Sequence, residues 1–207
     1  MTKNLIVPYT PALEKRFNQQ LKKVYVGQSQ MKKSRPVLYN VNVTNNGTVQ
    51  LTNSFVGVQL ENTDAQPTHL EGYPDMTRLF EVDHSRVDDS VPIQYDDLKI
   101  LENHLNVIYK QKIDNVKITL SNEGIAIENA KQGPDQVFIK SEIATELLTE
   151  RYHTFNINPR YLHDALMFYR QVYRDSYYIR VWTDRNGIVR LTFQDMTYII
   201  ATIRRNY

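Results

Sequence analysis

The residues with the clearest chemical potential are cations clustered near the N-terminus. From Glu14 to Arg35 the chain carries seven basic residues against one acidic residue, whereas from Glu61 to Asp97 ten acidic residues stand against two arginines. Cations grouped on one surface attract polyanions such as nucleic acid, and a block of carboxylates repels them. The pattern predicts one polyanion-binding face, with two ordinary solvated surfaces as the alternative.

Residues suited to catalysis are few. Asp83-His84-Ser85 has the residue types of a hydrolytic triad, but sequence neighbours do not give the spatial arrangement that a triad needs. The acid pairs Asp88-Asp89 and Asp96-Asp97 could bind a hard cation, although acids at a helix start usually interact with the helix dipole. The chain has no cysteine, which excludes disulfides, thiolate metal sites and a cysteine nucleophile. We therefore predict no catalytic residues, metal or cofactor, and a metal-dependent hydrolase is the enzymatic alternative.

The composition is that of a globular protein. Of the 207 residues 41% are hydrophobic and 23% are charged, with a net charge of +2. This length accommodates one large or two small domains. No segment is as long and apolar as a membrane span, and the N-terminus has no apolar signal-peptide core. We expect a cytoplasmic protein.

The last quarter of the chain reads as one helix followed by three strands. A strand leads into Asn158-Pro159, where asparagine suits a helix cap and proline suits the first helical turn. Apolar residues then recur at helical spacing from Leu162 to Tyr173. The strands are expected at Tyr178–Trp182, Ile188–Phe193 and Tyr198–Ile203, with Gly187 ending the first turn.

Two earlier segments have the same order of elements. A helix is expected over Pro11–Val26, followed by strands at 37–44, 48–52 and 55–60 with a turn at Gly47. A second helix is expected over Ile93–Lys112, followed by strands at 116–121 and 125–129 with a turn at Gly124, and by one long or two short strands within 136–148. The polar, acidic stretch 62–89 is expected to connect these segments.

The repetition predicts the fold class. Helices begin near Pro11, Tyr95 and Pro159, and the last two units are offset by 64 residues at the helix and 63 at the turn. Such offsets indicate a duplicated supersecondary unit. Three units of a helix plus an antiparallel meander predict an α+β fold with the helices on one face of the sheets.

Several motifs resemble the bacterial DNA polymerase III β subunit, the sliding clamp. Phe155-Asn-Ile-Asn-Pro-Arg-Tyr-Leu-His-Asp-Ala-Leu166 resembles the second-helix motif of the last clamp domain, and Val116–Glu128 resembles the preceding hairpin. Tyr198–Arg204 is similar to the C-terminal strand of the clamp. Gly72-Tyr-Pro-Asp-Met-Thr-Arg-Leu79 resembles the segment that joins the middle and last domains, and Arg35–Val43 resembles part of an earlier domain.

The resemblance implies a DNA-clamp-like fold that is shorter than a bacterial clamp. Residues 1–82 would form one helix-plus-meander half-domain and the joining segment, and residues 83–207 would form one complete domain of two halves. Bacterial clamps have three such domains, so the resemblance implies a reduced clamp of a phage-like or mobile-element kind. Because three half-domains cannot enclose a duplex, we expect a homo-oligomer, for which four copies would supply twelve halves.

Clamp helices face DNA phosphates without reading bases. Carried over to this sequence, the implied DNA-binding residues lie on the polar helix faces and in the basic loop: Lys15, Lys22, Lys23, Lys32, Lys33, Arg35, Lys99, Lys110, Arg170 and Arg174. Ordinary solvated helix surface is the alternative for each of them.

Clamps also bind short partner peptides in an apolar pocket. By position, its walls here would be Thr52, Ser54, Phe55, Val56, Pro74, Arg78, Leu79, Ile199, Ala201, Ile203 and Arg204. Family clamps usually have Gly-His-Arg where Ser54-Phe55-Val56 stands, and Met-Pro-Met where Ala201-Thr-Ile203 stands. The apolar members could instead fill a core.

The resemblance therefore implies a non-enzymatic processivity factor. Such a protein encloses duplex DNA without sequence preference and tethers a DNA polymerase or another clamp-binding protein. The alternative is a clamp fragment that binds a host clamp or clamp-binding partners without encircling DNA.

Overall fold

The computed structural model describes residues 6–25, 33–80, 90–129, 138–144, 153–173, 178–183 and 187–203. It divides into two compact units, Met1–Glu81 with Gln194–Ile199, and Val82–Phe193 with Ile200–Tyr207. The sequence predicted a single boundary at residue 82. The two units are not contiguous in sequence, because Gln194–Ile199 belongs to the first unit. Within the described ranges, no helix is both long and apolar enough to cross a lipid bilayer.

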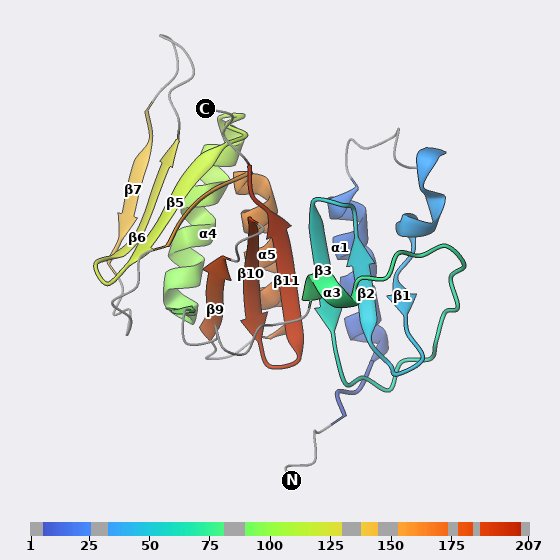
Figure 1. The fold of residues 1–207 in the computed structure, drawn as a ribbon. Coiled ribbons are helices and arrows are strands. Elements are labelled where there is room, and N and C mark those ends of the chain that lie inside the picture. Colours follow the sequence, from blue (N-terminus) through green and yellow to red (C-terminus); the bar gives the residue numbers. More distant parts are fainter. Residues whose placement is uncertain are drawn as a thin grey trace. The chain divides into compact units, whose positions relative to one another are not determined.

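In the first unit, one long helix lies on four neighbouring strands of a sheet (Figure 1). Helix α1 (Pro11–Val24) packs on the sheet through Phe17, Leu21 and Val24, which are buried. The sheet has the order β1-β2-β3-β11, formed by β1 (Asn42–Val43), β2 (Val49–Thr52), β3 (Val56–Leu60) and the start of β11 (Met196–Ala201). On the helix side, the Gln20 side-chain amide donates a 2.8 Å hydrogen bond to the hydroxyl of Tyr198. The short helix α3 (Thr77–Phe80) completes the unit.

The prediction of a strand over residues 37–44 is wrong for most of that range. Residues Pro36–Tyr39 form a 3-10 helix, η1, and only Asn42–Val43 is extended. Proline has a fixed φ and no N–H, which suits the first position of a helical turn and not the interior of a sheet. Leu38 enters the core, and the ring of Tyr39 stacks on Tyr25 at 4.0 Å between centroids. These two contacts favour the turn over the alternation read from the sequence.

The second unit consists of two interlocked halves. One half contains β4 (Val91–Gln94), α4 (Tyr95–Lys110), β5 (Val116–Ser121), β6 (Gly124–Asn129) and β7 (Lys140–Ile143). The other contains β8 (His153–Ile157), α5 (Pro159–Val172), β9 (Tyr178–Thr183) and β10 (Ile188–Phe193). The halves exchange strands: β8 pairs with β5 and β4 pairs with β9, both antiparallel. Helices α4 and α5 pack against each other, and this repeated arrangement confirms the predicted fold class.

Helices α1 and α5 begin at the predicted capping residues. Thr10 Oγ1 accepts a 3.2 Å hydrogen bond from the N–H of Leu13, and Asn158 Oδ1 accepts a 3.0 Å hydrogen bond from the N–H of Arg160. The helix expected over Ile93–Lys112 begins two residues later, because Val91–Gln94 pairs with β9 as a strand. Its buried stripe is the predicted one: Leu98, Leu101, Leu105 and Ile108.

The turn between β5 and β6 requires glycine at position 124. Its φ is +131°, and a Cβ built there would lie 2.0 Å from the carbonyl oxygen of Ile143. Only a residue without a side chain lets β7 approach β6 this closely. Of the strands expected within 136–148, β7 is the one among the described residues.

Candidate nucleic-acid and peptide interface

The exposed face of α1 carries the strongest positive charge among the described helices. Lys15 and Lys22 are exposed, opposite the buried stripe of Phe17, Leu21 and Val24, and Lys23 is half-buried. Because seven residues are two helical turns, the two exposed lysines share one side of the helix, about 10 Å apart along its axis. The helix holds four basic residues and one acidic residue, a net charge of +3. Its outer face can therefore attract a polyanion.

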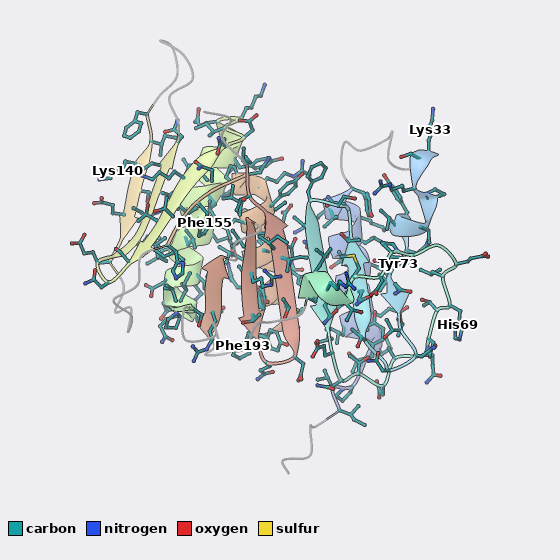
Figure 2. All side chains as sticks on the ribbon, in the orientation of Figure 1. Lys33, His69, Tyr73, Lys140, Phe155 and Phe193 are labelled. Carbon is teal, nitrogen blue, oxygen red and sulfur yellow. The ribbon has the colours of Figure 1, made fainter. Side chains whose placement is uncertain are left out.

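The basic loop adds charge at the start of η1. Lys33 is exposed and points away from the rest of the first unit (Figure 2). The guanidinium of Arg35 donates a 3.3 Å hydrogen bond to the hydroxyl of Ser54. This contact joins a residue of the predicted DNA-binding set to one of the predicted peptide pocket. Lys32 lies outside the described residues.

The cations of α4 and α5 are largely neutralised by neighbouring acids. Lys99 lies 3.5 Å from Asp96 and 4.6 Å from the centre of the Tyr95 ring, and Arg170 forms a 2.6 Å ion pair with Glu102. The hydrogen bond that Arg170 donates to Glu102 raises the pKa of Arg170 further above its usual value. Together the two helices contain four basic and four acidic residues, so their formal charges cancel. Lys110 is exposed, and Arg174 lies outside the described residues.

A tight turn between β2 and β3 presents Phe55 to solvent. The turn is built around Asn53, whose side chain is fully buried. Asn53 Oδ1 accepts 2.8 Å hydrogen bonds from the N–H groups of Phe55 and Val56, and its amide donates a 2.7 Å bond to the carbonyl of Val24 at the end of α1. Ser54 has a φ of +75°. Buried polar contacts thus fix the backbone of the turn that carries Phe55.

The predicted peptide-pocket residues of the first unit divide into exposed and buried groups. Phe55 and Leu79 are 50% and 40% exposed, and Ser54, Pro74 and Arg78 are exposed too. Thr52, Val56 and Ile199 are buried. A Cβ at Gly57 would lie 3.0 Å from both Ile199 and Phe80, so these side chains pack closely over β3.

The remaining pocket residues belong to the second unit or lie outside the described residues. Ala201 is half-buried at the end of β11. The N–H of Ile203 donates a 2.8 Å hydrogen bond to the carbonyl of Asn156. Arg204 lies outside the described part of the chain.

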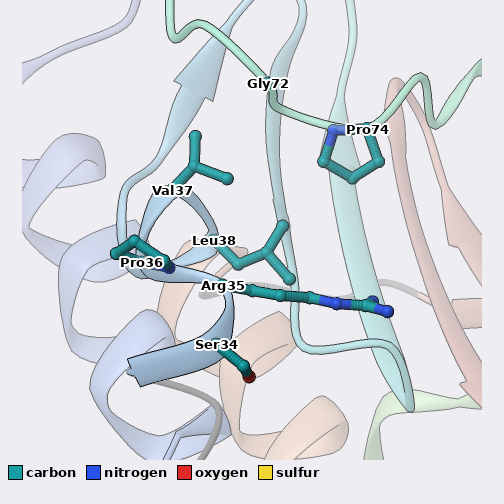
Figure 3. A pocket seen from close by; sticks show the side chains of 7 residues that line it. All are labelled: Ser34, Arg35, Pro36, Val37, Leu38, Gly72 and Pro74. Carbon is teal, nitrogen blue, oxygen red and sulfur yellow. The ribbon is translucent and has the colours of Figure 1, made fainter.

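A cavity of about 370 Å³ opens beside the predicted pocket residues of the first unit. Figure 3 shows Val37 and Leu38 of η1 on one wall, with Gly72 and Pro74 on the facing segment. Ser34, Arg35 and Pro36 complete the lining. Of these residues only Arg35 and Pro74 are in the predicted sets, because the sequence pattern placed 37–44 in a strand. The Arg35-Pro-Val-Leu38 run, in which proline begins a turn beside a cation, is the signal that could have indicated it.

Two histidines contact polar side chains at separate places among the described residues. His163 Nδ1 lies 3.7 Å from Asp164, which also lies 3.8 Å from Arg160, and Ser141 contacts the ring of His104 in a different place. No group of three described His, Asp or Glu side chains could hold a metal ion. Asp83-His84-Ser85 and Asp88-Asp89 lie outside the described residues.

Comparison with known proteins gives a clear result for structure and none for sequence. No family model matches the chain, and no curated protein matches its sequence. The β subunit of the DNA polymerase of Streptococcus pyogenes is similar at 15% identity and a TM-score of 0.62, with 92% of this chain and 64% of that chain covered. DNA polymerase III subunit β of Borrelia burgdorferi is similar at 11% identity and a TM-score of 0.66, with 93% and 62% covered. The β chain of DNA polymerase III from Streptococcus pneumoniae is similar at 17% identity and a TM-score of 0.62, with 91% and 63% covered.

Both units of this chain contribute to the match, since more than nine-tenths of its length is covered. The chain spans less than two thirds of the length of these similar proteins. At such low identity the similarity establishes the fold alone. The chain has the fold of the bacterial DNA polymerase III β subunit, the sliding clamp.

Proposed function

We propose that this protein is a sliding-clamp-like processivity factor that binds duplex DNA without sequence preference and tethers a replication protein. The fold supports this proposal, and the observation that carries it is the net charge of +3 on α1, whose two exposed lysines share one face. A factor that slides needs attraction to phosphates and no contacts that select particular bases. Lysines on a helix surface provide such an attraction.

The contrast among the three long helices supports α1 as the main contact with DNA. Arg170 is already paired with Glu102, and Lys99 is close to Asp96. A cation paired with a carboxylate gives up part of that interaction when it binds phosphate, so its net contribution is small. Lys15 and Lys22, together with Lys33 and Arg35, are therefore proposed to provide most of the affinity for DNA.

The proposed partner site is the cavity between η1 and the segment that contains Gly72 and Pro74. Peptide-binding sites are concave and mostly apolar, with a few polar groups at the rim. Val37, Leu38 and Pro74 provide apolar walls, and Arg35 provides a donor at the rim. The exposed ring of Phe55 would extend the apolar surface, because its neighbour Ser54 accepts a hydrogen bond from Arg35 at the rim.

The DNA proposal is tested by fluorescence anisotropy with two 30-base-pair duplexes of unrelated sequence, at salt concentrations from 50 to 200 mM. Weak and equal binding to both duplexes, with an affinity that falls steeply with salt, is expected for phosphate contacts. A preference for one sequence, or no binding at the lowest salt concentration, would contradict the proposal.

Replacing Val37 by glutamate should weaken peptide binding by about tenfold, because a charge would be placed on an apolar wall. The measurement is titration with a fluorescent clamp-binding peptide taken from a bacterial DNA polymerase. Val41→Glu is the matched control, since Val41 is half-buried four residues later and does not line this cavity. Equal binding by the wild type and Val37→Glu would exclude this cavity as the peptide site.

A further inference from the structure

The first unit contains a second cavity, of about 530 Å³, which shares no lining residue with the proposed peptide site. Helix α1 contributes Glu14, Asn18 and Leu21 to it, and their spacing places them on one face of the helix. Residues of the segments 39–43 and 64–70 form the other walls. A cavity of this volume has the size of a small-ligand site.

Position 14 distinguishes α1 from the two long helices of the second unit. Glu14 is the fourth residue of its helix. The fourth residues of α4 and α5 are Leu98 and Leu162, and both are buried. Glu14 is instead exposed at the cavity. A carboxylate at this repeated apolar position indicates a surface that is open to water and not one that packs against another element.

The segment 64–70 is fixed to β1 and to the residues before α1. The N–H of Thr68 donates a 3.1 Å hydrogen bond to the carbonyl of Val43, and the N–H of Val43 donates a 2.9 Å bond to Thr68 Oγ1. Asp64 Oδ1 accepts a 2.6 Å bond from the N–H of Tyr9. This wall is therefore a fixed part of the unit, and Asp64 has a defined place in it.

The cavity is negatively charged. Glu14 and Asp64 line it, and no lysine, arginine or histidine is among its described lining residues. Two carboxylates attract a cation and repel an anion. No group of three described His, Asp or Glu side chains could hold a metal ion, and a hard metal cation needs more oxygen ligands than this pair provides. The charge therefore favours an organic cation.

An aromatic ring and apolar side chains complete the lining. Tyr9 packs edge-to-face against Phe17 of the core, with 6.1 Å between ring centroids. Burial, together with the neighbouring Glu14 carboxylate, raises the pKa of Tyr9 to about 12. Val43 and Ala65 are buried members of the lining. Aromatic rings stabilise cations, and apolar side chains accommodate the aliphatic stem of an amphipathic cation.

We propose that this cavity binds a primary ammonium group carried on an aliphatic stem. Glu14 and Asp64 would pair with the ammonium group, and the ring of Tyr9 would lie beside it. The stem would cover Val43 and Ala65. A free aliphatic amine and a lysine side chain of a partner protein both present this group.

Titration of the nitrogen-15-labelled protein with butylammonium, followed by NMR, tests the proposal. Saturable shifts are expected for the backbone amides of Tyr9 and Ala65, which belong to the lining. Butyrate, which has a similar length and the opposite charge, should cause none. Nα-acetyl-lysine N-methylamide should bind at least as tightly as butylammonium if a lysine side chain is the source, and more weakly if a free amine is. Binding of neither cation, or equal binding of butyrate, would overturn the proposal.

Glu14→Gln and Asp64→Asn should each weaken butylammonium binding by about fivefold, because each removes one charge of the pair. Both replacements preserve the side-chain shape, and asparagine at position 64 keeps the acceptor for the N–H of Tyr9. Glu71→Gln and Asp75→Asn are the matched controls, since these exposed acids of the same unit do not line the cavity. They should bind like the wild type. Unchanged binding when both Glu14 and Asp64 are replaced would overturn the proposal.

Substitution of Tyr9 separates the ring from the hydroxyl. Tyr9→Leu should weaken butylammonium binding by roughly threefold, because it removes the cation–π contact, and Tyr9→Phe should leave binding unchanged. Thermal unfolding of each variant measures whether the fold is retained. Equal losses for the two folded variants would contradict the ring contact.

The ammonium site does not depend on the proposed function, and its measurements are made without DNA. Glu14 is the acidic residue of α1, so Glu14→Gln should weaken butylammonium binding without weakening DNA binding. A protein that binds butylammonium but not duplex DNA would contradict the clamp proposal and leave this inference intact, and the reverse result would do the opposite.

Discussion

Replacing both Lys15 and Lys22 by glutamate should lower the affinity for duplex DNA by on the order of 50-fold at 0.1 M salt. Each phosphate contact contributes about −0.9 to the slope of log affinity against log salt, which corresponds to roughly eightfold in affinity at that concentration. The slope should therefore decrease in magnitude by about two. Both residues are exposed, so the stability of the fold should hardly change. Anisotropy titrations over a salt series measure the slope and the affinity together.

The control for this experiment is Lys112→Glu with Lys117→Glu, which changes the net charge by the same amount outside the long helices. Lys117 is 3.5 Å from Glu128 on the neighbouring strand. If general charge attraction were responsible, both double variants would lose the same affinity. Equal losses would therefore contradict a specific role of α1.

The pair Lys99→Glu and Lys110→Glu addresses the second unit. Because the acids of α4 and α5 balance their cations, we expect a smaller loss than for α1. A loss as large as that of the α1 variant would show that the helices contribute equally.

Replacing Asn53 by alanine should lower the free energy of unfolding by about 3 kcal/mol or more. The side chain is fully buried and makes three hydrogen bonds to backbone groups of Val24, Phe55 and Val56. Removing it leaves up to three buried polar groups without partners, each at a cost of about 1–3 kcal/mol. Urea unfolding followed by circular dichroism measures the change.

Asn53→Asp separates the two functions of this side chain. Aspartate keeps the acceptor for the N–H groups of Phe55 and Val56 but loses the donor to the carbonyl of Val24. The free energy of unfolding of this variant should lie between the values for the wild type and the alanine variant. If both variants were as stable as the wild type, Asn53 would not hold the turn in place.

Local patterns in the sequence correctly identified most of the elements. Thr10, Asn158 and Pro159 mark helix starts because their own side chains or rings satisfy the requirements of the first turn. The apolar stripe from Leu98 to Ile108 indicates a buried helix face because its period matches the helix. Such signals involve residues that are close together in the sequence, so they can be recognised without knowing the tertiary structure.

The predictions failed where distant contacts outweighed a local pattern. Val37–Val43 has the alternating side-chain pattern typical of a strand. The segment nevertheless begins with a 3-10 turn, because packing of Leu38 and stacking of Tyr39 on Tyr25 stabilise that conformation more. The helix expected from Ile93 begins later because Val91–Gln94 finds a strand partner in β9, more than eighty residues away. Alternation and periodicity contain no information about partners that far along the chain.

The sequence by itself determined three helix-and-strand units and the cluster of cations on the first helix, because both follow from residue types at short spacing. Tertiary structure alone decided which cations are neutralised, since Arg170 and Glu102 meet only when α4 packs on α5. It also decided that Asn53 is buried and bonded to Val24 at the end of α1, and that a cavity forms beside Pro74. Each of these features joins residues that are remote in sequence, and such contacts depend on which faces pack together.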